Sequence, residues 1–66
     1  MRIISIRAIA RKNNINHMKL WRLFKIYVAL YGDDPRYVIV EYNGKRRPTE
    51  EFVRFVENAL GIKLKL

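Results

Sequence analysis

Hydrophobic positions near the start of the chain follow a helical spacing. Over residues 5–12, one face of the predicted helix collects the apolar side chains Ile6, Ile9 and Ala10. Ser5 stands immediately before them, where a serine hydroxyl caps a helix start. Asn13 and Asn14 follow, and asparagine tolerates the left-handed conformation better than most residues with a Cβ. The pair therefore predicts the end of this helix.

A second apolar stripe predicts a helix that starts near His17, with Asn16 as its cap. The stripe repeats at i, i+3, i+4 and i+7 and consists of Leu20, Leu23, Phe24 and Tyr27. Residues 26–31 are an unbroken, β-rich apolar run that fits either the last turns of a buried helix or a strand. If they form a strand, residues 32–35 turn it into a hairpin with residues 36–42. Periodicity leaves both interpretations open.

The middle of the chain predicts a β-hairpin. Residues 37–42 alternate as a strand does, and Asn43-Gly44 after them is the strongest short-range hairpin signal. The returning arm, residues 45–47, is stopped by Pro48 and must be short.

The remaining residues predict a helix and a short strand. Thr49 is a suitable N-cap for the helix, and Gly61 a suitable terminator. The apolar stripe between them consists of Phe52, Val53, Phe55, Val56 and Leu60. Apolar residues alternate with lysines over residues 62–66, which suggests a terminal strand that pairs with residues 37–42 in this chain or in a partner. We therefore expect one α+β domain over residues 1–66: a helix-turn-helix-like helix pair, a β-hairpin, a C-terminal helix and a final short strand.

Charge divides the chain into two unequal halves. The first 31 residues carry seven basic side chains and no acidic one, whereas residues 32–66 carry seven basic and six acidic. Nearly all of the net charge of +8 therefore lies in the first half. Such a block repels itself on compaction unless a polyanion neutralises it, so we expect a nucleic-acid partner.

Residues 7–24, RAIARKNNINHMKLWRLF, resemble the DNA-binding helix-turn-helix of bacterial and archaeal transcription regulators and of site-specific recombinases. That pattern typically reads I-A-R-x-x-G-[IV]-S-x-x-x-[VIL]-x-R-x-[LI]. The like residues here are Ile9, Ala10, Arg11, Ile15, Leu20, Arg22 and Leu23. Ala10 must be small because the second helix crosses close to it. Asn14 stands where the family prefers glycine, and Asn13 stands at a site that is usually apolar.

The resemblance implies a set of nucleic-acid-binding residues. Base-reading positions fall on the first part of the second helix, at Asn16, His17, Lys19 and Arg22, with Lys25 further along the same helix. Arg7, Arg11 and Lys12 on the first helix would hold phosphates and fix the register. A second basic cluster, Lys45, Arg46 and Arg47, follows the hairpin turn and resembles the wing of winged-helix proteins, although it would also keep a hairpin edge soluble.

The aromatic residues have ordinary structural interpretations. A tryptophan on an apolar helix, such as Trp21, more often lies in a core or a dimer interface than on a base. Tyr27, Tyr31, Tyr37 and Tyr42 could form a stacking platform, but such tyrosines more often edge a core with the hydroxyl in water.

Several functional classes have little support in the sequence. There is no cysteine, one histidine and no nucleophile–base set, so we expect no enzyme, no metal site, no cofactor and no small-molecule substrate. The chain offers no transmembrane stretch, and we expect a cytoplasmic protein without a membrane partner. Abundant charge and isoleucine with no glutamine fit a thermophile, and a compact basic protein suits a virus or mobile element.

The favoured function is binding of duplex DNA, as a small regulator or accessory factor. One alternative is an interaction module whose basic face docks an acidic protein, with residues 37–42 extending a partner sheet. Another alternative is an RNA-binding protein. The helix-turn-helix family usually has an additional helix before the motif, so the missing wall must come from the hairpin, the last helix or a second subunit. Because one chain lacks that usual helix to cover both apolar stripes, we also expect a homodimer.

Overall fold

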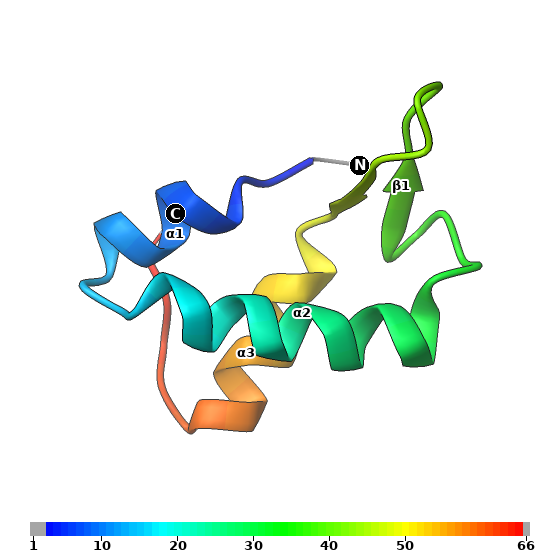
Figure 1. Ribbon diagram of the computed structural model, residues 1–66. Helices are drawn as coiled ribbons and strands as arrows, with labels where there is room; N and C mark the ends of the chain where they lie inside the picture. The colour runs from blue at the N-terminus through cyan, green and yellow to red at the C-terminus, as the bar shows by residue number, and fades with distance from the viewer. Residues whose placement is uncertain (1–2, 66) are drawn as a thin grey trace.

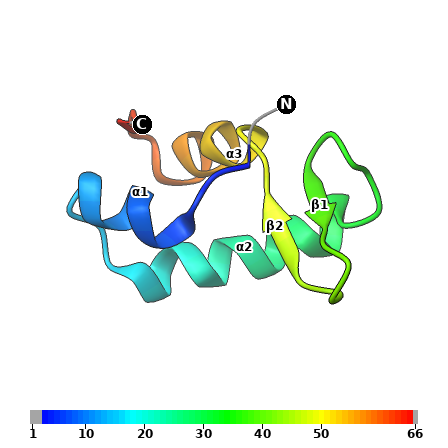
Figure 2. The same ribbon diagram turned by 90° about the horizontal axis from the view of Figure 1, so that it is seen from above.

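The computed structural model describes residues 3–65. Its elements are α1 (Ile6–Lys12), α2 (His17–Tyr31), β1 (Val38–Val40), β2 (Arg46–Pro48) and α3 (Glu51–Leu60). The two strands form an antiparallel hairpin, so the predicted α+β class is confirmed. The helix α1 and the hairpin lie at opposite ends of α2, while α3 packs alongside α2 (Figures 1 and 2).

No helix in this part of the chain has the length and apolar character that a membrane span requires.

The ends of α1 and the start of α2 are formed by the residues that the sequence predicted for them. The Ser5 hydroxyl accepts a hydrogen bond from the Ala8 amide at the start of α1. At its end, Asn14 has a φ of 54°, and the Ile15 amide donates to the Ala10 carbonyl at 2.9 Å. This is the arrangement of a Schellman motif, with asparagine in the position that glycine usually takes. The side chain of Asn16 then caps α2 by accepting from the Met18 amide.

The ambiguous residues 26–31 are helical, and packing against α3 gives the reason. Tyr27 is completely buried, with its ring 5.0 Å from that of Phe52 and 5.3 Å from that of Phe55. Tyr31 stacks on Tyr37 with ring centroids 4.4 Å apart. A helix places Phe24, Tyr27 and Tyr31 on one face, whereas a strand would direct Phe24 and Tyr27, which are three residues apart, to opposite sides. Gly32 follows as the C-cap, so the alternative hairpin between residues 26–31 and 36–42 does not form.

The helix α3 supplies the wall that the helix-turn-helix pattern lacks at its start. Phe52 is fully buried and meets the ring of Phe24 at 5.6 Å, so the stripes of α2 and α3 cover each other within one chain. The reason for expecting a homodimer, that both stripes would stay uncovered, is therefore wrong. A homodimer remains a sequence-based prediction without that support.

The hairpin forms with a shorter first strand and a longer loop than the sequence predicted, and its return strand includes Pro48 instead of ending before it, because Pro48 pairs with Val38. Only residues 38–40 of the predicted strand 37–42 are assigned to β1. The Gly44 amide donates to the Glu41 carbonyl at 2.8 Å, and Gly44 has a φ of 83°. Among residues 3–65 Asn14 is the only residue with a Cβ at positive φ, so Asn43 does not adopt the left-handed conformation of a two-residue turn. Residues 42–44 thus make a three-residue loop with glycine in the left-handed position.

Thr49 does not cap α3 as predicted. The helix begins at Glu51, and its N-cap, Glu50, makes no side-chain capping bond. The Thr49 hydroxyl is buried and lies 2.7 Å from the Arg36 carbonyl, to which it donates. A buried hydroxyl must be paired, and the chain entering β1 provides the acceptor. Gly61 does end α3 in the left-handed conformation, as predicted.

The predicted terminal strand is absent from residues 62–65, and Leu66 lies outside the described residues. The side chain of Asn13 instead holds this segment against α1. Its amide nitrogen donates to the Lys65 carbonyl at 2.9 Å, while its oxygen accepts from the Lys65 amide at 2.6 Å. Asn13 thus satisfies backbone groups that a strand partner would otherwise have taken. Ile3 forms an antiparallel bridge with Thr49, the residue that follows β2, so Ile3 lies beside the end of this strand.

The close contact between α1 and α2 at Ala10 can be tested by substitution. Ala10 is 3% exposed, so Ala10→Leu overpacks the contact and should lower the free energy of unfolding by about 1–3 kcal/mol. Ala8→Leu adds the same volume to an exposed position of α1 and serves as the matched control. Denaturant melts measure both, and equal stability of the two variants would contradict this packing.

The buried phenol of Tyr27 predicts a loss of stability at alkaline pH. Burial raises the pKa of Tyr27 to about 12, while an exposed tyrosine ionises near pH 10. The folded state therefore favours the neutral phenol. Its contribution to stability is complete below about pH 10 and is lost as the pH rises towards about 12. Tyr27→Phe should flatten this part of the stability profile, whereas Tyr42→Phe, at an exposed position, should not. Identical profiles for both variants would refute the assignment.

Candidate nucleic-acid interface

A groove of about 330 Å³ separates the first turns of α1 and α2 from the strand β2. Its basic lining comes from three elements that are distant in sequence: Arg7, His17, Lys45, Arg46 and Arg47. The apolar floor includes Ile4, Ile6 and Phe24. We call this the central groove. It brings five of the eleven residues that the sequence singled out for nucleic-acid binding to one place.

An aromatic pair forms the α2 side of the central groove. The indole nitrogen of Trp21 donates a hydrogen bond to Nε2 of His17, one helical turn earlier. The Trp21 ring also meets the Phe24 ring edge-on, with centroids 5.6 Å apart. These contacts fix an indole that remains 37% exposed.

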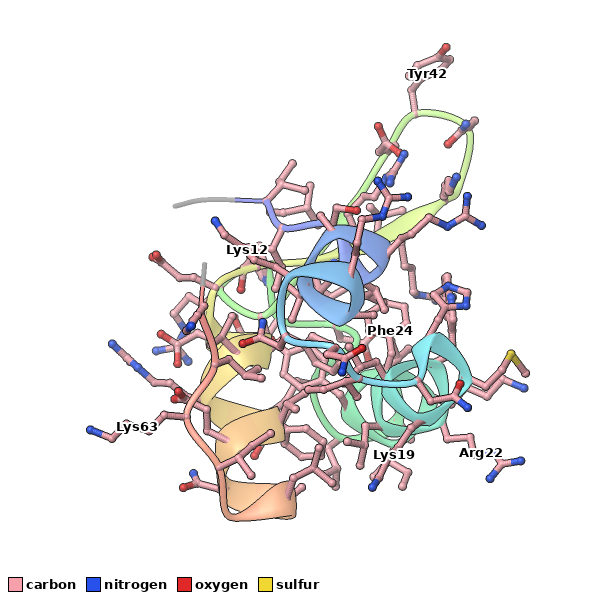
Figure 3. All side chains as sticks on the ribbon, turned by 90° about the vertical axis from the view of Figure 1, so that its left-hand side faces the viewer. Lys12, Lys19, Arg22, Phe24, Tyr42 and Lys63 are labelled. Carbon is pink, nitrogen blue, oxygen red and sulfur yellow. The ribbon has the colours of Figure 1, made fainter. Side chains whose placement is uncertain are left out.

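The exposed face of α2 continues from this groove. Met18 and Arg22 are one turn apart, as are Trp21 and Lys25, so the four side chains form two adjoining rows. Arg22 and the hairpin tip both lie on the right-hand side of Figure 3, with Arg22 near the bottom and the tip at the top. Arg22 and Lys25 are therefore placed beside the groove without lining it.

Three predicted residues are placed less favourably. Lys12 points to the opposite side from Arg22 and lines a separate cavity of about 160 Å³ with Ile3 and Lys65 (Figure 3). Lys19 precedes the half-buried Leu23 by one turn and points away from the hairpin (Figure 3).

The third of these residues, Asn16, uses its Oδ1 to cap α2, so it could pair with adenine through both of its polar atoms only if the cap broke. Arg11, by contrast, follows Arg7 by one turn and extends its row along α1.

Three acidic side chains, Asp34, Glu51 and Glu57, have partners outside the lining of the central groove. Asp34 binds Arg36 at 2.8 Å, and hydrogen bonds from Arg36 hold the pKa of Asp34 below its usual range. Glu51 binds Arg54 at 3.0 Å, and the Glu57 carboxylate accepts from the Leu64 amide. Within residues 3–65 no ion pair involves the exposed cations Arg7, Arg11, Arg22 or Lys25. Their charge is left for an external anion.

The hairpin cations differ among themselves. Arg47 binds Glu41 across the hairpin at 2.9 Å, and its charge is partly compensated. Lys45 and Arg46 are exposed and make no ion pair with the described residues. Lys45 and Arg46 are thus the cations that the hairpin offers to a ligand.

Trp21 and Tyr42 are more exposed than the sequence predicted. Trp21 lines the groove and lies outside the core, while its place in a dimer interface stays a prediction. Tyr42 is 102% exposed at the hairpin tip, whereas Tyr31 and Tyr37 are half-buried, as predicted for core-edge tyrosines. Tyr27, by contrast, is completely buried, and its hydroxyl donates to the Tyr37 carbonyl instead of to water. The place of Tyr42 directly before Asn43-Gly44 was a signal for a loop tip. The exposure of Trp21 had no comparable signal.

No protein-family model matches the chain, and comparisons with curated proteins and with solved structures give no significant match.

Proposed function

We propose that this protein binds duplex DNA through the exposed face of α2 and the hairpin, as a small transcription regulator or accessory factor. The observation that carries the proposal is the convergence of cations without acidic partners. They come from α1, α2 and the hairpin, and they surround the central groove. Fixed cations without counterions favour a polyanion, because each phosphate contact releases condensed counterions.

The dimensions of the molecule favour a duplex. An α-helix with its side chains is about 10–12 Å wide and enters a major groove about 12 Å wide. The exposed face of α2 would present Met18, Arg22 and Lys25 to base edges. One strand of the duplex would then pass along the central groove, where Arg7 and Arg46 contact its phosphates from opposite walls. The longest dimension of the molecule is 31 Å, which corresponds to about one helical turn of DNA.

Binding to labelled duplex DNA, single-stranded DNA and RNA across a salt series tests this proposal. We expect the duplex to bind most tightly, with a logarithmic salt slope of about −0.9 for each phosphate contacted. Preference for RNA or single strands would redirect the assignment to those ligands. Absence of binding to all three at low salt would overturn it and favour the acidic-protein partner.

Single charge removals should separate the interface from the rest of the surface. Arg22→Ala and Arg46→Ala each remove one exposed cation near the groove, so each should reduce the salt slope by up to about 0.9 if that residue contacts a phosphate. Lys63→Ala removes the same charge from the opposite side of the molecule and is the matched control (Figure 3). Equal slopes for all three variants would place the contacts elsewhere.

Arg22 also allows phosphate contact and base reading to be distinguished. Arg22→Lys keeps the charge but loses the planar fork that pairs with guanine. If Arg22 reads a base, this variant should keep the salt slope and lose discrimination among duplex sequences. Unchanged discrimination, measured by competition among duplexes, would restrict Arg22 to the backbone.

A further inference from the structure

Tyr42 is the most exposed of the large hydrophobic side chains among residues 3–65. It projects from the tip of the hairpin, beyond the rest of the molecule (Figure 3). In that part of the chain its ring makes no aromatic contact and its hydroxyl makes no hydrogen bond. The other three tyrosines all pack against aromatic neighbours. Tyr42 therefore contributes nothing visible to the fold.

Hydrogen bonds within residues 41–45 and one ion pair hold the loop that carries Tyr42. The Glu41 amide donates to the Lys45 carbonyl at 2.8 Å, and the Gly44 amide donates to the Glu41 carbonyl at 2.8 Å. The Lys45 amide donates to Oδ1 of Asn43 at 3.0 Å. The Glu41–Arg47 pair joins the two arms immediately behind the tip. These bonds restrain the loop, so less conformational entropy is lost when the Tyr42 ring binds a partner.

The surroundings of the tip indicate what the ring would meet. Lys45 and Arg46 follow the loop and would contact phosphates on either side of a groove. Tyr42 and Arg22 both lie on the right-hand side of Figure 3, with Tyr42 at the top and Arg22 near the bottom. When α2 occupies the major groove, a hairpin at the end of α2 can reach the neighbouring minor groove. There a phenol offers a flat apolar face and a hydroxyl that can donate to the acceptors of A·T pairs.

We propose that Tyr42 is a wedge that enters the minor groove, partly unstacks one base step and bends the DNA. This inference rests on the proposed function, since it requires a bound duplex. It assigns to the hairpin tip a role that charge alone does not provide, because the ring acts on the base stack while Lys45 and Arg46 act on the backbone.

The experiment combines three readouts on one duplex. Anisotropy gives affinity, 2-aminopurine placed at successive steps reports unstacking, and energy transfer between the duplex ends reports bending. We expect the parent protein to raise 2-aminopurine emission at one step and to shorten the end-to-end distance. Tyr42→Ala should abolish both signals and weaken binding about 10-fold, within the range for loss of one stacked aromatic. Its salt slope should stay unchanged, because no cation is removed.

Tyr42→Phe and Lys63→Ala are the controls. Tyr42→Phe retains the ring and should keep the unstacking signal, and Lys63→Ala should behave as the parent. All variants should melt as the parent does, because both positions are exposed.

Duplex binding by Tyr42→Ala with parental affinity, unstacking and bending would overturn the wedge while leaving the proposed function intact. A parent protein that binds duplexes without unstacking or bending them would also overturn it. Failure of the parent to bind any duplex would instead remove the proposed function.

Discussion

The carbonyl of Tyr37 joins three parts of the chain that are far apart in sequence. It accepts from the Tyr27 hydroxyl at 2.7 Å and from the Thr49 amide at 3.0 Å, and the Thr49 hydroxyl lies 3.1 Å away. Tyr27 belongs to α2, Tyr37 leads into β1, and Thr49 connects β2 to α3. Both Tyr27 and Thr49 are completely buried, so these bonds form where water cannot replace them. The position of the hairpin relative to α2, and with it the width of the central groove, depends on this junction.

Local signals in the sequence were sufficient for the helix ends. Ser5, Asn14, Asn16 and Gly61 act on backbone groups within a few residues of themselves, and all four were assigned correctly. Thr49 was assigned wrongly because its hydroxyl has a choice between a nearby amide and a distant carbonyl. The tertiary fold, which brings Arg36 within 2.7 Å, decides that choice. The helical state of residues 26–31 was likewise decided by aromatic partners on α3.

In the candidate site, too, local features could be predicted from the sequence, whereas features that depend on tertiary packing could not. Residue type and helical spacing were enough to place Arg7, Arg22 and the hairpin cations on an exposed basic surface. They did not reveal that the Asn16 side chain would be used as a cap, or that Lys12 would face the C-terminal segment. Exposure of Trp21 depends on how far β2 stands from α2, which is a property of the whole fold. The charge of a side chain follows from the sequence, but the direction in which the side chain points depends on how the helices and strands pack.

Trp21 is the only tryptophan in the chain, and its position gives the molecule an internal optical reporter. The indole lies between the imidazole of His17 and the ring of Phe24, at the wall of the central groove. An anion or a base that enters the groove would change the polarity around the indole. The emission of the unlabelled protein should therefore record whether the groove is occupied.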